Sequence, residues 1–266
     1  MGEITIQDVI EGMNLSEPVT VTPETRLRDA LQIMSSNGFS QLPVVKEDKL
    51  KGMLSYKSIV KQMELNQDFE RKKGSIALLE LAVRHFTDPD AKALSLDDSV
   101  FELFKVTKAE DAVVIGETGG KPRYVITNFD AVNILERLSE VFLLIEQIED
   151  MLRSILKKQL ETQGLDLSEI VQKINQNLGP AQQSYHLPRT IEKMSWDNYI
   201  TFITNKESWT PLFSKMFETI TSVKNYFSFV RDLRNDVFHF RKLSHTLGDS
   251  EINKLGRIKA WLKNFQ

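Results

Sequence analysis

The pattern of hydrophobic and polar positions changes near the middle of the chain. Up to about residue 137, apolar residues come in short runs bounded by turn-forming residues, which predicts short strands alternating with helices. From about Ser139, glycines become rare and apolar residues recur every three to four positions, which predicts helices. The sequence therefore predicts an α+β fold, with a mixed region over 1–137 and an all-α helical bundle over 138–266.

The first region contains one pattern twice, over about 1–66 and about 87–137. Each copy has an extended segment, a helix, two short strands joined by a polar or glycine turn, and a second helix. The predicted strands are 41–45 and 50–55 in the first copy, and 111–115 and 123–127 in the second. Leu27, Val44 and Ser55 correspond to Val100, Val114 and Thr127. Between the copies, Lys57–Phe86 is predicted as helix with a break at Gly74.

Each copy places a hydroxyl where a strand ends and a helix begins: Ser55 in the first and Thr127 in the second. Thr127 and Asp130 are three residues apart, which is the spacing of a helix capping box. A helix N-terminus also favours anions, so Thr127 could bind a phosphate oxygen while Asp130 accepts the hydroxyls of a ribose. Both interpretations can hold at once.

The whole repeat resembles the CBS-domain family, in which tandem pairs form a nucleotide-sensing Bateman module. The resemblance implies an adenosine nucleotide (AMP, ADP or ATP) as regulatory ligand. It implies that Thr127 and Asp130 bind phosphate and ribose, and that Ala93 and Leu94 line the adenine pocket. In the first copy, Ser55 would supply the nucleotide-binding hydroxyl that corresponds to Thr127. The first copy departs from the pattern because Ser58 stands where the aspartate should be. We therefore expect one good nucleotide site, in the second copy, and one weak or empty site.

The second region begins with a long amphipathic helix marked by Val141 to Leu156 and closed near Gly164. Its further predicted helices are 168–177, 190–194, 196–203, 209 or 211–220, a continuation to about 243, and 250–262, the last capped by Asp249 or Ser250. The polar stretch Leu165–Pro188 contains one of these helices and is otherwise left open between an ordered segment and a mobile loop.

The helix near residue 230 carries the apolar stripe Ile220, Val223, Phe227, Val230 and Val237, and position 234 on that stripe is arginine. A desolvated guanidinium needs a partner. One interpretation is an ion pair with Glu146 or Glu149 on the first bundle helix.

The string from Asp232 to His239, with Arg234-Asn235 and an R-x4-H spacing, resembles the HEPN family of helical domains, over about residues 139–245. Many members are metal-independent endoribonucleases that act as homodimers. The resemblance implies catalytic roles for Arg234, Asn235 and His239: His239 as general acid or base and Arg234 as stabiliser of phosphate charge. Some members carry a tyrosine where this chain has Arg241, so functions of that tyrosine are not carried over.

Composition narrows these hypotheses. The chain has no cysteine, which excludes thiolate chemistry and disulfides, and its net charge of −3 gives no global reason to expect RNA or membrane binding. It has no signal-peptide or membrane-spanning pattern, which predicts a cytoplasmic protein. Three functions stay open: a nucleotide-gated ribonuclease acting on RNA, a non-catalytic nucleotide sensor that dimerises or binds a partner, and a helical domain that binds nucleotide without cleaving RNA. No metal is implied.

Overall fold

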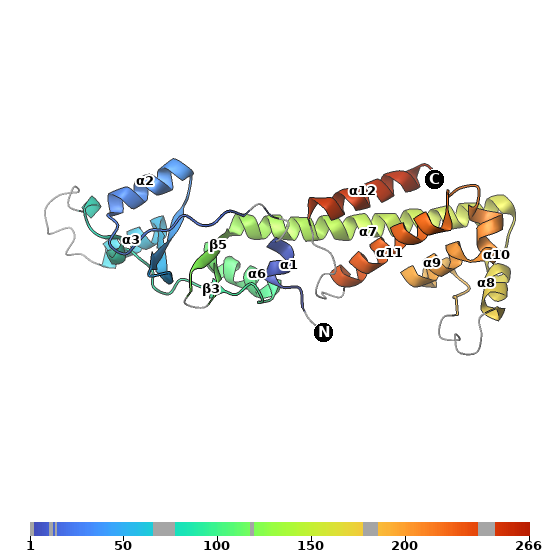
Figure 1. The fold of residues 1–266 in the computed structure, drawn as a ribbon, viewed down its shortest axis with the longest axis horizontal. Helices are drawn as coiled ribbons and strands as arrows, with labels where there is room; N and C mark the ends of the chain where they lie inside the picture. The colour runs from blue at the N-terminus through green and yellow to red at the C-terminus, as the bar shows by residue number, and fades with distance from the viewer. Residues whose placement is uncertain are drawn as a thin grey trace. The chain divides into compact units, whose positions relative to one another are not determined.

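A computed structural model describes residues 3–10, 13, 15–65, 78–117, 120–177, 186–238 and 248–266 (Figure 1). The chain divides into two compact units. The first is Thr5–Leu135, and the second is Glu136–Gln266 together with the four residues Met1–Ile4. The first unit is mixed α and β, and every strand of the described residues lies in it. The second is helical. Gly74 lies outside the described residues.

The first copy is built around the antiparallel pair β1 (Gln41–Lys46) and β2 (Lys49–Ser55). Val21 adds a parallel bridge to Val44 on β1. Helices α2 (Leu27–Asn37) and α3 (Tyr56–Leu65) supply the apolar residues that complete a buried core. The core members at most 1% exposed are Leu27, Ala30, Met34, Leu42, Val44, Leu54, Val83 and Phe86. These strands and helices follow the predicted order.

The second copy repeats this arrangement. Strand β3 (Ala93–Leu94) runs parallel to β4 (Ala112–Gly116), which pairs antiparallel with β5 (Pro122–Thr127), and α6 (Val100–Ala109) joins β3 to β4. Gln41 pairs with Ser55 in the first copy, and Ala112 pairs with Thr127 in the second. If Ser55 and Thr127 are equivalent, Val44 therefore matches Ile115. The predicted match of Val44 with Val114 is therefore wrong by one residue, because the structure matches Val44 with the next residue, Ile115.

The two copies exchange their leading segments. Helix α1 (Ile6–Ile10) precedes the first copy but bonds to the second, and the 3-10 helix η1 (Val83–His85) precedes the second copy but bonds to the first. The equivalent backbone bonds are Val83 N to Thr25 O and Ile6 N to Asp98 O, both 2.8 Å, and Arg84 N to Pro23 O and Gln7 N to Leu96 O, both 3.0 Å. This reciprocal exchange relates the copies by an approximate twofold symmetry within the first unit.

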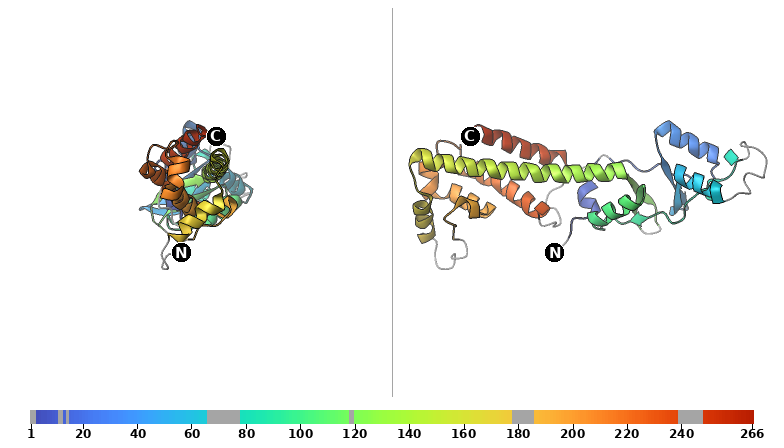
Figure 2. Two further views of the ribbon diagram at one scale, coloured as in Figure 1. Left: turned by 90° about the vertical axis from the view of Figure 1, so that its right-hand side faces the viewer. Right: turned by 180° about the vertical axis from the view of Figure 1, so that it is seen from behind.

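Helix α7 (Asn128–Gln163) begins directly after β5 and is 36 residues long (Figures 1 and 2). The sequence pattern predicts two helices here, the last helix of the second copy and a bundle helix starting near Ser139. That prediction is wrong, because both stretches belong to α7. No glycine or proline occurs between 128 and 163, so nothing in the sequence interrupts the backbone hydrogen bonds. Gly164, at φ +63°, then ends the helix.

The second unit contains α8 (Leu167–Gln176), α9 (Trp196–Thr204), the short α10 (Lys206–Ser208), α11 (Ile220–Phe238) and α12 (Asp249–Lys263). A 3-10 turn, η3 (Ile191–Lys193), and a π-helical segment, η4 (Trp209–Phe213), occupy two of the predicted α-helical stretches. Helix α11 contacts α9 along its length. The buried residues of α11 are Val223, Phe227, Phe229, Val230, Leu233 and Val237.

Two local predictions differ from the structure. Helix α3 confirms the beginning of the predicted helix Lys57–Phe86, and residues 78 and 79 are helical too, but 80–82 are not and 83–85 form η1, so the prediction is wrong at its end. The N-cap of α12 is Gly248, whose side chain offers no acceptor, and not Asp249 or Ser250. Asp249 instead lies in the first turn of α12, where the helix dipole stabilises a carboxylate.

Candidate functional site

Thr127 and Asp130 lie together at the junction between β5 and α7. The Thr127 backbone N–H and hydroxyl donate to Asp130 Oδ2 at 2.9 and 2.7 Å, and the Asp130 N–H donates to Thr127 Oγ1 at 3.3 Å. This is the geometry of a capping box, which stabilises the start of a helix. The Thr127 N–H and hydroxyl both contact Asp130 Oδ2, and both residues are half-buried.

Ser55 and Ser58 form the equivalent junction between β2 and α3. Ser58 Oγ accepts from the Ser55 N–H at 2.8 Å and donates to the Ser55 carbonyl at 2.9 Å, while the Ser58 N–H donates to Ser55 Oγ at 2.9 Å. The Ser58 side chain is buried, at 4% exposed. Its hydroxyl is therefore engaged within the chain, and this junction lacks the carboxylate that the second copy carries.

A cavity of about 310 Å³ lies beside the first junction. Ser55 and Ser58 line it, and so do Gln41, Lys57, Lys61, Lys92 and four acidic residues, Asp88, Asp90, Glu110 and Asp111. The carboxylates outnumber the ammonium groups, and Lys57 already pairs with Asp111 at 3.7 Å. The amide nitrogen of Gln41 is buried without a hydrogen-bond partner. The cavity thus offers donors to a polar ligand but does not favour a highly anionic one.

Of the five predicted nucleotide-binding residues, only Ser55 lines this cavity. Ala93 and Leu94 form β3, with Ala93 exposed and Leu94 half-buried. Gln41 and the three lysines were not among the predicted site residues. Lys92 and Glu110 give no sequence signal that they lie beside Ser55, because they belong to the other copy and are distant in sequence.

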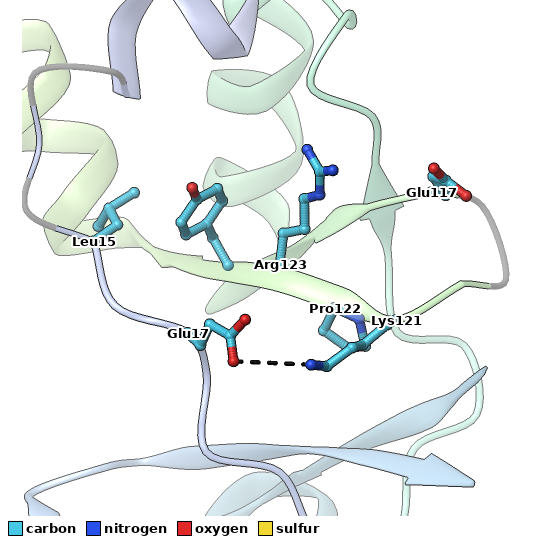
Figure 3. Close-up of a pocket in the computed structure, with 7 residues that line it drawn as sticks. Leu15, Glu17, Glu117, Lys121, Pro122 and Arg123 are labelled. Atoms are coloured by element: carbon cyan, nitrogen blue, oxygen red, sulfur yellow. Dashed lines mark ion pairs between the residues drawn. The ribbon is translucent and has the colours of Figure 1, made fainter. Parts of the chain in front are cut away.

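A second cavity, of about 420 Å³, lies beside β5 (Figure 3). Leu15 and Glu17 line it from the segment before the first copy, and Lys121, Arg123 and Glu117 come from the β4–β5 hairpin and its flanks. The Lys121 ammonium lies 3.8 Å from the Glu17 carboxylate. Two cations and two carboxylates balance, so charge alone selects no class of ligand here, and none of the predicted site residues lines this cavity.

In the second unit, Arg234 lies on α11 and is half-buried. Its guanidinium carbon is 4.9 Å from the centre of the Phe238 ring, and one terminal nitrogen donates to Asn235 Oδ1 at 3.4 Å. Arg234 Nε is buried without a hydrogen-bond partner, and among the described residues no carboxylate pairs with this guanidinium. Phe238 in turn stacks on Phe142 of α7, with ring centres 4.2 Å apart. His239, Arg241 and Lys242 lie outside the described residues.

Among the described residues neither Glu146 nor Glu149 forms an ion pair with Arg234, so that interpretation is wrong. Glu149 has other partners. Its carboxylate accepts from an Arg153 terminal nitrogen at 2.5 Å and from the Trp196 indole N–H at 3.1 Å. Arg153 Nε donates to the Tyr199 hydroxyl at 2.8 Å. This network ties α7 to α9. Burial raises the pKa of Tyr199, and the hydrogen bond from Arg153 opposes part of that rise.

Within the described ranges, no group of three or more His, Asp and Glu side chains is arranged to hold a metal ion. No helix among the described residues is long and apolar enough to cross a membrane.

Comparison with known proteins identifies the first part of the chain. Residues 6–65 match the family model of the CBS domain. Cystathionine beta-synthase of Saccharomyces cerevisiae is 24% identical over 147 residues, covering 50% of this chain and 28% of that protein. A manganese-dependent inorganic pyrophosphatase of Thermotoga maritima, described as probable, is 32% identical over 57 residues, covering 21% of this chain and 10% of that protein.

Two solved structures each resemble about half of the chain. Protein MJ1225 from Methanocaldococcus jannaschii is 19% identical with a TM-score of 0.44, over 50% of this chain and 48% of that one. CBSX2 in complex with AMP is 15% identical with a TM-score of 0.41, over 51% of this chain and 98% of that one. The chain spans less than a third of each curated relative that it matches. Residues 6–65 are a CBS domain, in a mixed α and β region that is followed by a helical region.

Proposed function

We propose that the repeat over 1–137 is a tandem CBS pair that binds an adenosine nucleotide and regulates the helical region over 138–266. The observation that carries this proposal is the second-copy junction, where the half-buried Asp130 lies in the first turn of α7 and holds Thr127 through one carboxylate oxygen, Oδ2. Vicinal ribose hydroxyls can donate to the Asp130 carboxylate, and the Thr127 hydroxyl and the first turn of α7 suit a phosphate. Ala93 and Leu94 would contact the base.

The first copy supports the expected asymmetry between the two sites. Ser58 uses its hydroxyl on Ser55, and the neighbouring cavity has more carboxylates than lysines. A polyphosphate would meet unfavourable charge there. We therefore propose one nucleotide per chain, bound at the second copy.

Calorimetric titration with AMP, ADP and ATP tests this site. The wild-type chain should bind one nucleotide, and Asp130→Ala should lose at least tenfold in affinity because it removes a charged acceptor. Ser58→Asp is the matched gain-of-function variant, because it restores a carboxylate at the equivalent position, and it should raise the stoichiometry towards two. Unchanged affinity in Asp130→Ala would rule out the assignment.

For the helical region we propose a metal-independent endoribonuclease of the HEPN type, acting on RNA as a homodimer. The observation that favours it is Arg234, whose guanidinium has no carboxylate partner among the described residues and carries an unpaired Nε. Such a cation is available to an RNA phosphate. His239 would take the proton from a ribose 2′-hydroxyl as its oxygen attacks phosphorus, or protonate the departing 5′-oxygen, with Asn235 beside the phosphate.

RNA cleavage in EDTA tests the ribonuclease, with and without nucleotide, in the wild-type chain, Arg234→Met and His239→Ala. Loss of cleavage in both variants with unchanged thermal stability supports it. Cleavage retained in His239→Ala would remove that residue from the mechanism. Absence of cleavage in the wild-type chain under every nucleotide condition would favour the alternative, a non-catalytic nucleotide sensor that dimerises or binds a partner. Gating would require that nucleotide binds the two states of the helical region with different affinities.

A further inference from the structure

Phe142 of α7 packs against the end of α11, next to Arg234. Its ring stacks on the ring of Phe238, with centres 4.2 Å apart and planes at 12°. Phe238 is the last residue of α11, and the Arg234 guanidinium carbon lies 4.9 Å from the centre of its ring. Positions four apart share a face of a helix, so Arg234 and Phe238 meet on α11 itself. Phe142 adds a contact to this pair from a different helix.

The Phe238 ring is the main restraint on the Arg234 guanidinium among the described residues. The hydrogen bond from Arg234 to Asn235 Oδ1 is 3.4 Å long, beyond the usual range of about 2.7–3.2 Å. No carboxylate in the described part of the chain pairs with this guanidinium, and its Nε is buried without a partner. Because the face of an aromatic ring attracts a cation, the position of the Phe238 ring determines where the guanidinium lies.

Phe238 in turn depends on Phe142. The last turn of a helix is less restrained than its middle, because its carbonyl groups have no partners within the helix. A ring at such an end is held by what it packs against, and a stacked aromatic pair stabilises beyond the area that it buries. Phe142 is 41% exposed, so its ring lies at the surface and does not complete the buried core. Core packing therefore does not explain a phenylalanine at this position.

We infer that Phe142 is a positioning residue for the proposed ribonuclease. Through Phe238 it fixes the Arg234 guanidinium in the orientation that meets the scissile phosphate. The inference rests on the proposed function and deepens it, because it adds a residue of α7 to the site on α11. Stabilisation of a transition state is sensitive to misplacement of the stabilising group by about 1 Å. Loss of the Phe142 ring should therefore slow cleavage without weakening the binding of RNA.

Kinetics of RNA cleavage in EDTA separate positioning from binding. Phe142→Leu should lower kcat about 10–100-fold and change KM less than about twofold, whereas Phe142→Tyr keeps a ring and should retain kcat. Leu143→Ala is the matched control, because Leu143 is the next residue of α7, is 51% exposed and has no ring to stack. It should leave both constants unchanged. Wild-type kcat in Phe142→Leu would overturn the inference. A rise in KM alone would overturn it too, because Phe142 would then bind RNA directly.

NMR of the arginine side chains gives a second measurement, which needs no activity. The buried Nε of Arg234 slows the exchange of its proton with water, and its signal is the one absent from Arg234→Lys. The ring current of Phe238 displaces this signal in the wild-type chain. Phe142→Leu should move it towards the signals of exposed arginines, and Phe142→Tyr should not.

An unmoved Arg234 signal in Phe142→Leu would overturn the inference, whatever the kinetics. If the wild-type chain cleaves no RNA and the signal does move, the proposed ribonuclease is refuted, while the positioning of Arg234 by Phe142 stands.

Discussion

Gly52, on β2, is the position where a single added methyl group should disturb the contact between the two copies most. Its backbone has φ +142°, which side chains rarely adopt, and a Cβ there would lie 2.2 Å from the Asp88 carbonyl oxygen and 2.6 Å from Thr87 Cγ2. The next residue, Met53, exchanges two backbone hydrogen bonds with Asp88, at 2.9 and 2.8 Å. Gly52→Ala must therefore move the Asp88 segment away from β2.

The cost follows from these contacts. Backbone strain at such a φ is about 1–3 kcal/mol, and weakening two hydrogen bonds adds about 0.5–1.5 kcal/mol each. We expect Gly52→Ala to lower the free energy of unfolding by about 2–6 kcal/mol. Gly38→Ala is the matched control in the same unit: its φ is +69°, but nothing lies within 4 Å of the added Cβ. That variant should cost only about 1–2 kcal/mol, the ordinary penalty of left-handed backbone.

Urea unfolding followed by circular dichroism measures both variants against the wild-type chain. The midpoint should fall more for Gly52→Ala than for Gly38→Ala, at similar slopes. Equal losses in the two variants would refute the steric argument, because the two glycines share a positive φ and differ in what surrounds the added atom.

Three further predictions concern side chains. In Tyr199→Phe, the stability should depend less on pH above about 10 than in the wild-type chain. Burial raises the pKa of Tyr199 in the folded state, so the wild-type chain loses stability as pH rises from about 10, the unfolded pKa, through the higher folded pKa. Urea midpoints at about pH 8 and 10.5 measure this dependence, and an equal fall in both proteins would contradict the prediction. Glu149→Ala should cost about 2–4 kcal/mol in urea unfolding, because the buried Trp196 and the half-buried Arg153 lose their acceptor. A loss under about 1 kcal/mol would mean that the network is not stabilising. Lys46→Ala should leave the thermal midpoint unchanged, since its ion pair with Glu24 is exposed, and a clear fall would contradict that view.

The sequence pattern predicts the strands and helices of the first unit closely, because short β-branched runs bounded by turns are a strong local signal. It misplaces the match between the copies by one residue. The reason is that the run Val113-Val114-Ile115 is apolar throughout, so apolar character does not decide which of these residues corresponds to Val44; the strand pairing decides it.

The long helix α7 is a second case. The hydrophobic pattern predicts one helix before Ser139 and another after it, because glycines become rare and the spacing of apolar residues changes near that residue. The absence of glycine and proline from 128 to 163 is the stronger signal, because no residue there interrupts the helix.

The candidate site is predictable where its residues are close in sequence and not where they are distant. The Thr127–Asp130 spacing predicts the hydrogen bonds that the structure contains. The Glu149–Arg153 contact follows from a spacing of four on one helix, whereas the contact of Glu149 with Trp196, 47 residues away, has no signal in the sequence. The roles of Thr127, Asp130 and Arg234 in binding or catalysis stay predictions.

The exchanged segments α1 and η1 make the two copies mutually dependent. Each copy leaves backbone groups near its first helix, such as the carbonyls of Thr25 and Asp98, to be satisfied by the leading segment of the other. A fragment that contains one copy lacks that segment, and it could make these bonds only by trading the segment with another molecule. Either copy expressed alone should therefore be less stable than the pair, since backbone carbonyls that the other copy satisfies would lose their N–H partners.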